Sequence, residues 1–150
     1  MLLQYLLRAF ILLVFASSSQ LMSQDLSQYR WQNRLIVLQA RAEGENICRQ
    51  QLQVLEEDVE GLMERKLIVV QLAESENRIH LPEPLPLELK EKDQKRFRAS
   101  EKPFSFILIG LDGGVKLRSH ELVSREYLYA LIDGMPMRRA ELREKKNHQP

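Results

Sequence analysis

Short apolar runs separated by polar segments predict the strands of the chain. Three runs are aliphatic and short enough to be strands with both faces buried. They are Arg34–Gln39 (RLIVLQ), Leu67–Leu72 (LIVVQL) and Phe104–Leu111 (FSFILIGL). A fourth segment, Val115–Arg118 (VKLR), alternates apolar and polar residues, which predicts a strand with one exposed face. The second run, bounded by polar turns, is typical of a central parallel strand.

In the segments between the predicted strands, the apolar residues are spaced as in helices. From Ile47 to about Glu64 the apolar residues fall roughly on one face and the acidic residues mostly off it, which predicts an amphipathic helix. The charged segment Leu87–Arg98 predicts a surface helix. Ser124 is a good N-cap for the next helix, whose buried stripe is formed by Leu128, Leu131 and Ile132.

Glycine and proline residues mark the turns. The prolines within Ala73–Pro86 predict an irregular loop there. The triplet Asp112-Gly113-Gly114 predicts a tight hairpin, because glycine tolerates the positive φ of such turns. Gly134 fits a left-handed helix C-cap, and Pro136 prevents continuation of that helix.

The predicted order of elements is β-α-β-α-β-β-α. Two parallel βα units followed by a hairpin and a helix predict an α/β domain with a central mixed sheet, in the thioredoxin-like arrangement. This topology carries a fold and no function.

The first residues read as a secretory leader. An apolar run over Ala9–Ala16 is followed by small residues, and Arg8 is the only charge of the segment. The run is shorter than the roughly 20 residues of a membrane-spanning helix. We therefore expect a signal peptide over residues 1–18 and an exported protein, periplasmic or secreted; the alternative is an uncleaved N-terminal anchor.

The domain organisation follows from these elements. A lead-in over residues 19–29 precedes a thioredoxin-like domain over residues 30–142, and a basic tail covers residues 143–150.

Composition excludes several classes of function. The 22 basic and 21 acidic residues of the 150-residue chain nearly cancel, so no basic surface for nucleic acid is expected. The single cysteine excludes an intramolecular disulfide and zinc sites built on two or more cysteines. The three histidines lie far apart in the sequence. We expect neither a metal nor a cofactor.

Two motifs resemble a known family. The segment LIGLDGGVKLRSHELVSREYLYALIDGMPMRRAEL, Leu108–Leu142, resembles the closing motif of an uncharacterised bacterial family, domain of unknown function 4174, and Trp31-Gln32-Asn33-Arg34 resembles its start. The resemblance covers about Leu26–Leu142, and Leu111 stands where the family usually has lysine. The motif residues are Trp31, Asn33, Arg34, Asp112, Gly113, Gly114, Asp133, Met135, Pro136 and Met137.

The resemblance implies a fold but no reaction. The same domain type is similar to modules of animal extracellular-matrix proteins of the sushi-repeat and equarin group, which are described as thioredoxin-like. The family supplies no established activity that could be transferred to this chain.

The cysteine is the one candidate for redox chemistry. A thioredoxin-like redox site lies where the first strand meets its helix, because the helix N-terminus stabilises a thiolate. That junction, Gln39–Asn46, lacks cysteine, and Cys48 falls inside the helix start. Glu43 and Glu45 would raise a thiol pKa, whereas Arg41 and Arg49 would lower it. We interpret Cys48 as a small buried hydrophobe; the alternative is a one-cysteine redox or peroxidatic thiol, and dithiol exchange is excluded.

Four basic residues are candidates for binding an anionic partner. Lys116 and Arg118 share one face of the last strand, and Arg138 and Arg139 follow a helix whose C-terminal dipole favours cations. The alternative is that these charges are solvated, with an arginine capping helix carbonyls.

The sequence therefore predicts a non-catalytic thioredoxin-like interaction module of the cell envelope. Its partner would be a protein or another anionic molecule, with no nucleic acid and no membrane contact except through an uncleaved leader. The alternative is a thiol-dependent redox or peroxidase-type envelope enzyme that uses Cys48.

Overall fold

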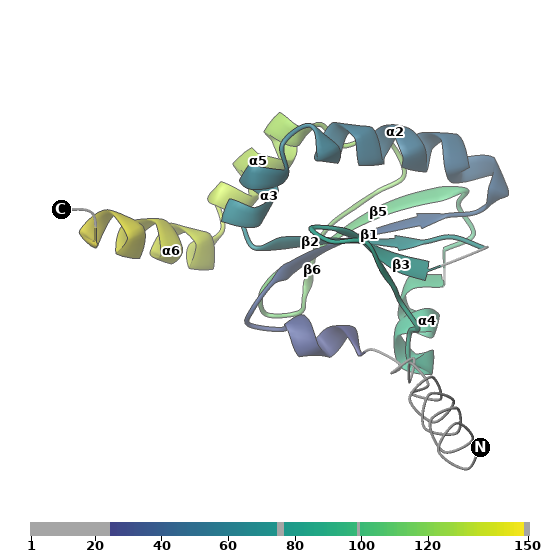
Figure 1. The fold of residues 1–150 in the computed structure, drawn as a ribbon, viewed down its shortest axis with the longest axis horizontal. Coiled ribbons are helices and arrows are strands. Elements are labelled where there is room, and N and C mark those ends of the chain that lie inside the picture. Colours follow the sequence, from purple (N-terminus) through teal and green to yellow (C-terminus); the bar gives the residue numbers. More distant parts are fainter. Residues whose placement is uncertain (1–24, 75–76, 99, 149–150) are drawn as a thin grey trace, which may run out of the picture.

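A computed structural model describes residues 25–74, 77–98 and 100–148 (Figure 1). The predicted signal peptide, residues 1–18, lies outside the described residues. Within the described ranges no helix is both long and apolar enough to cross a bilayer.

One six-stranded mixed sheet forms the centre of the domain. Its strands follow the order β4-β3-β2-β1-β5-β6. β1 pairs with β2 in parallel, and every other neighbouring pair is antiparallel. The predicted α/β class with a central mixed sheet is confirmed. The strands are β1 (Arg34–Ala40), β2 (Leu67–Leu72), β3 (Asn77–Leu81), β4 (Leu85–Pro86), β5 (Phe104–Ile109) and β6 (Val115–Ser119).

The described residues form five α-helices around this sheet. Figure 1 shows α2, α3 and α5 on one side of it and α4 on the other, while α6 extends away from one end. A short 3₁₀ helix, η1 (Leu26–Tyr29), precedes β1 on the side of α4. The helices are α2 (Glu45–Glu56), α3 (Val59–Glu64), α4 (Glu91–Arg98), α5 (Arg125–Asp133) and α6 (Pro136–Asn147).

Two apolar cores explain why the central strands have no polar face. Successive side chains of β1 point to opposite sides of the sheet. Ile36 and Leu38 therefore pack under α2 and α5, whereas Leu35 and Val37 pack toward η1 and α4. Phe97 of α4 is buried in the second core.

The prediction of an irregular loop over Ala73–Pro86 is wrong in part, because β3 and β4 form a hairpin there. Pro82 and Pro84 lie between the two strands. Pro86 ends β4 at the sheet edge, where a missing N–H removes no bond from the ladder.

The helix expected from Ile47 to Glu64 is interrupted. The Asp58 carboxylate accepts a hydrogen bond of 2.9 Å from the Gly61 N–H and begins α3 as its N-cap. Short polar side chains compete with helical backbone bonds in this way.

The end of α5 also differs from the expectation. Gly134 has φ −75°, so the predicted left-handed cap is wrong there, while Gly113 in the hairpin has φ +78° as predicted. Pro136 occupies the first turn of α6, where its missing N–H removes no helical bond. α6 continues to Asn147 and so includes much of the predicted basic tail, residues 143–150.

Candidate functional site: a basic pocket at the amino end of the central strand

The carboxyl end of β1 holds the predicted redox candidate. Cys48 lies near the start of α2, which follows β1; it is 1% exposed and packs in the core between this helix and the sheet. Burial raises the pKa of its thiol to about 11, Glu45 adds to the shift, and Arg78 opposes it. Because the thiolate is the nucleophile, the raised pKa lowers the fraction of reactive thiolate at neutral pH. It lines a hollow of about 280 Å³ together with Arg49 and Arg78.

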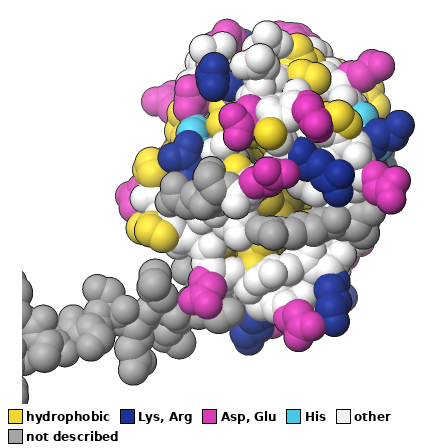
Figure 2. All heavy atoms as spheres, turned by 90° about the vertical axis from the view of Figure 1, so that its right-hand side faces the viewer, with side chains coloured by type: hydrophobic (Ala, Val, Ile, Leu, Met, Phe, Trp, Pro, Cys, Tyr) yellow, Lys and Arg dark blue, Asp and Glu magenta, His cyan; other side chains and the backbone are white. Residues whose placement is uncertain are grey.

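Figure 2 faces this end of the molecule. Acidic and basic side chains are interspersed over it, so no field of one sign is evident on that face.

A pair of residues at this end also resembles a nucleophile and its base. The Ser105 hydroxyl lies 3.2 Å from Nδ1 of His120, a pair that the sequence spacing did not reveal. Nδ1 also lies 3.0 Å from the Phe104 carbonyl oxygen, which can only accept a hydrogen bond. Nδ1 therefore carries a proton and cannot remove one from Ser105, which is fully buried.

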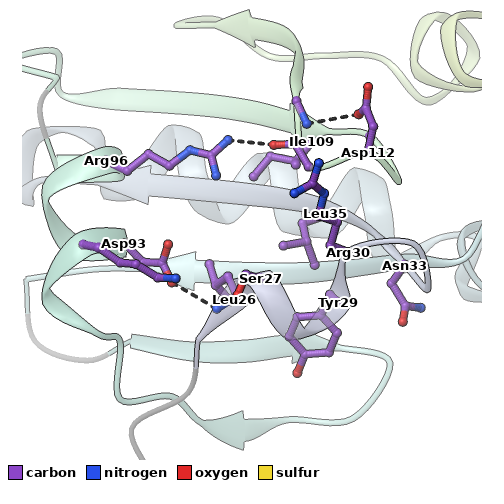
Figure 3. A pocket seen from close by; sticks show the side chains of 14 residues that line it. Leu26, Ser27, Tyr29, Arg30, Asn33, Leu35, Asp93, Arg96, Ile109 and Asp112 are labelled. Atoms are coloured by element: carbon purple, nitrogen blue, oxygen red, sulfur yellow. Dashed lines mark hydrogen bonds between the residues drawn. The ribbon is translucent and has the colours of Figure 1, made fainter.

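A larger hollow of about 440 Å³ lies at the opposite end of β1 (Figure 3). We call it the amino-end pocket. η1, the start of β1, helix α4 and the β5–β6 turn contribute its walls. Its lining residues are Leu26, Ser27, Tyr29, Arg30, Asn33, Leu35, Lys92, Asp93, Arg96, Ile109, Gly110, Asp112, Gly113 and Gly114.

The pocket combines apolar walls with a charged rim. Leu26, Leu35 and Ile109 belong to the core between the sheet and α4, and they form the apolar part. Arg96 donates a hydrogen bond of 2.9 Å to the Gly113 carbonyl oxygen. The Arg30 side chain lies against the same glycine, because a Cβ built on Gly113 would be 3.6 Å from Nε of Arg30. Two guanidinium groups thus approach one turn.

Other charges of the rim have partners. Nζ of Lys92 lies 2.6 Å from a carboxylate oxygen of Asp25 and holds the pKa of that carboxyl below its usual range. Asp112 pairs with Lys116 at 2.7 Å and also accepts the Gly114 N–H, and both contacts lower its pKa. Asp93 is buried and accepts the Leu26 N–H at 3.0 Å.

Both sequence motifs contribute to this pocket. The Trp31 N–H donates a hydrogen bond of 2.7 Å to the Leu111 carbonyl oxygen, which joins the opening motif to the hairpin. Asn33 and the residues Asp112, Gly113 and Gly114 line the pocket itself. Trp31 is 58% exposed beside it, with φ +68°, and the Arg30 guanidinium lies 5.2 Å from the centre of its ring.

The remaining motif residues lie at the junction of α5 and α6. Met135, Pro136 and Met137 line an apolar hollow of about 220 Å³. Arg34 and Lys116 also line this hollow.

The four predicted binding cations do not gather on one surface. Arg118 on β6 and Arg139 on α6 are exposed and form no ion pair with the described part of the chain. Lys116 is held by Asp112. Arg138 is 4% exposed and pairs with Asp133 at 3.1 Å and with Glu64 at 3.2 Å. It also donates to the backbone carbonyl of Glu64, the last residue of α3.

Arg138 belongs to a network of charges that contains a second buried arginine, Arg34. Arg34 is 1% exposed and donates to the carbonyl of Arg65 and to the Glu141 carboxylate. Burial alone would raise the pKa of Asp133, but hydrogen bonds from Arg65 and Arg138 outweigh it and lower that pKa. This network fastens α6 to the sheet and to α3.

In the described ranges, no group of three or more histidine, cysteine, aspartate or glutamate residues is arranged to hold a metal ion.

A family model described as "Domain of unknown function (DUF4174)" matches residues 25–141. This match confirms the resemblance carried by the two sequence motifs and covers nearly the same residues. No solved structure matches the chain.

Proposed function

We propose, from the premise that the chain belongs to the DUF4174 family, that it is an exported binding module built on a thioredoxin-like scaffold. The strand order β2-β1-β5-β6 supports this scaffold, because it places one parallel βα unit beside an antiparallel hairpin. The β3–β4 hairpin extends that core on one side. The leader-like sequence of residues 1–18 supports export.

The observation that best supports a binding role is the burial of Cys48 and the raised pKa of its thiol. In this scaffold the carboxyl end of β1 is where thiol chemistry would be expected. The thiol there is buried, with a pKa of about 11, and the chain contains no second cysteine. An accessible hollow with apolar walls and a charged rim lies at the other end of β1. The scaffold therefore presents a binding surface in place of a redox centre.

Thiol reactivity tests this proposal against the one-cysteine enzyme. The purified protein is treated with a chromogenic disulfide reagent at pH 8, and peroxide consumption is measured for the wild type and for Cys48→Ser. We expect slow labelling, which accelerates only when the protein is unfolded, and no turnover that depends on Cys48. Rapid labelling together with Cys48-dependent peroxide consumption would establish the enzyme instead.

A capture experiment tests the binding role directly. The immobilised wild type and Cys48→Ser are each exposed to envelope extract under reducing and non-reducing conditions. We expect both proteins to retain the same partners in both conditions, because a noncovalent binding surface does not use the thiol. Partners retained only by the wild type without reductant would indicate mixed disulfides and contradict the proposal.

A further inference from the structure

We propose that the amino-end pocket binds a carboxylate group of a partner polypeptide between Arg30 and Arg96. This inference rests on the proposed binding function and names the chemistry of its partner. The carboxylate would belong to an acidic side chain or to a free C-terminus.

The first support is the position of the two arginines. In Figure 3 the guanidinium groups of Arg30 and Arg96 both lie over the pocket, near the turn that carries Gly113. Neither forms an ion pair with a carboxylate of the described residues, unlike Lys92 and Lys116. Each guanidinium has five N–H groups in a planar fork, and Arg96 uses one nitrogen for the Gly113 carbonyl. The remaining donors suit a carboxylate, which accepts two parallel hydrogen bonds.

The second support is the balance of charge inside the pocket. Lys92 is paired with Asp25, and Asp112 is paired with Lys116. Of the lining residues this leaves Arg30, Arg96 and the buried Asp93, which is two positive charges against one negative charge. A single net positive charge matches a carboxylate. A phosphate group carries nearly two negative charges at neutral pH, which exceeds this net charge.

The third support is the apolar wall beside the cations. Leu26, Leu35 and Ile109 line the pocket next to the arginines, and Tyr29 is half-buried there. Ligand sites commonly combine an apolar surface with a few polar groups that fix orientation. This wall would accept the aliphatic part of a residue whose carboxylate reaches the arginines. Inorganic anions have no such aliphatic part.

The test uses Trp31 as its reporter, because it is the only tryptophan and it contacts Arg30. Three short leucine- and alanine-containing peptides, all N-acetylated, are titrated into the full-length protein while tryptophan fluorescence and heat are recorded. One has a free C-terminus, one has a C-terminal amide, and one has the amide plus a single glutamate. We expect saturable binding of at least one carboxylate peptide, about tenfold or more tighter than the fully neutral amide. The two acidic peptides distinguish the C-terminal from the side-chain source.

Matched variants locate the site. The double variant Arg30→Gln/Arg96→Gln is compared with Arg118→Gln/Arg139→Gln, which removes the same charge from exposed arginines outside the pocket. We expect the first to weaken carboxylate binding about tenfold or more and the second to change it less than about twofold. If the double variant unfolds, Arg30→Glu replaces it, because Arg30 is exposed and its side chain forms no hydrogen bond with the described residues. This variant should abolish binding.

Several results would overturn the inference. They are equal binding of the acidic and neutral peptides, unchanged binding in Arg30→Glu, and inorganic phosphate that competes as strongly as the carboxylate peptide. The experiment distinguishes failure of the carboxylate inference from failure of the proposed binding function. Envelope partners retained equally by wild type and Arg30→Glu would leave a binding module whose contact lies elsewhere.

Discussion

The Arg34 guanidinium lies 3.3 Å from the Glu141 carboxylate, so the first residue of the central strand is tied to the last helix. Arg138 reaches the same carboxylate at 3.4 Å. Two buried arginines thus share one acidic partner, and α6 is held by charge rather than by an apolar face. Removing Arg138 would leave the partly buried carboxylates of Glu141 and Asp133 undercompensated.

The first prediction concerns Arg138. We expect Arg138→Ala to lower the free energy of unfolding by about 3 kcal/mol, because Asp133, Glu64 and Glu141 each lose a hydrogen-bond donor. Arg139→Ala, at the exposed neighbouring position, should change it by less than about 0.5 kcal/mol. Urea denaturation of both variants measures the difference. Equal losses would show that the buried network does not stabilise the fold.

The second prediction concerns pH. The pKa of Asp133 is lower in the folded chain than in the unfolded chain, because Arg65 and Arg138 hydrogen-bond to it. Its contribution to stability is therefore complete above the unfolded pKa, about 3.9, and is lost as the pH falls through the folded value.

We expect the free energy of unfolding to decline below about pH 5 in the wild type and to decline less steeply in Asp133→Asn. Glu91→Gln removes a carboxylate from an exposed helix pair with Lys95 and should keep the wild-type acid limb. Denaturant titrations between pH 7 and pH 2 provide the comparison. Parallel curves for wild type and Asp133→Asn would contradict the assignment.

Local patterns predicted the parts of the fold that depend on neighbouring residues. The aliphatic runs became β1, β2 and β5, because strands covered on both faces need no polar positions. Ser124 caps α5 as predicted, with its side chain accepting the Tyr127 N–H. The Asp112-Gly113-Gly114 turn was also predictable, because the positive φ of Gly113 favours glycine.

Features made by distant residues could not be predicted in the same way. Strands β3 and β4 contain few apolar residues, and they are strands because they pair with one another and with β2. The amino-end pocket joins Arg30, at the start of the predicted domain, to Arg96 in a charged segment predicted only as a surface helix. Only the resemblance motifs pointed to its other wall, since Asn33 and Gly113 belong to them.

Charged residues were the hardest to interpret from sequence. Arg138 and Arg139 are adjacent and chemically identical, yet one is buried and the other is exposed. The direction of each side chain depends on where α6 begins, and that is set by Pro136. The sequence alone therefore could not indicate which of the two arginines is buried.

A third prediction concerns Gln51, a buried polar residue of α2. Its amide donates to the Val123 carbonyl oxygen at 3.0 Å and accepts the Val123 N–H at 2.7 Å. Gln51→Leu leaves both backbone groups buried without partners, so we expect a loss of about 2–3 kcal/mol in the free energy of unfolding. Gln50→Leu, at the adjacent exposed position, should be nearly neutral. Faster hydrogen exchange at the Val123 amide in Gln51→Leu alone would identify the cause.

The fourth prediction compares two glycines. A Cβ at Gly44 would overlap the backbone carbonyl of Pro103, which cannot move aside as a flexible side chain could. We therefore expect Gly44→Ala to destabilise the fold by about 1–3 kcal/mol through overpacking at the start of α2. At Gly134 the backbone is right-handed, and a Cβ would meet its neighbours at 3.4 Å or more. Gly134→Ala should be neutral, or stabilising by up to about 1 kcal/mol, because alanine lowers the entropy of the unfolded chain.

Thermal and urea unfolding of the two alanine variants measure this contrast. A left-handed Gly134, as the sequence suggested, would instead make Gly134→Ala destabilising by about 1 kcal/mol. Destabilisation by both substitutions would therefore contradict the right-handed end of α5. A neutral Gly44→Ala would contradict the close approach of the β1–α2 junction to the segment before β5. The pair thus tests, with one methyl group each, the packing at the carboxyl end of β1 and the junction that leads into α6.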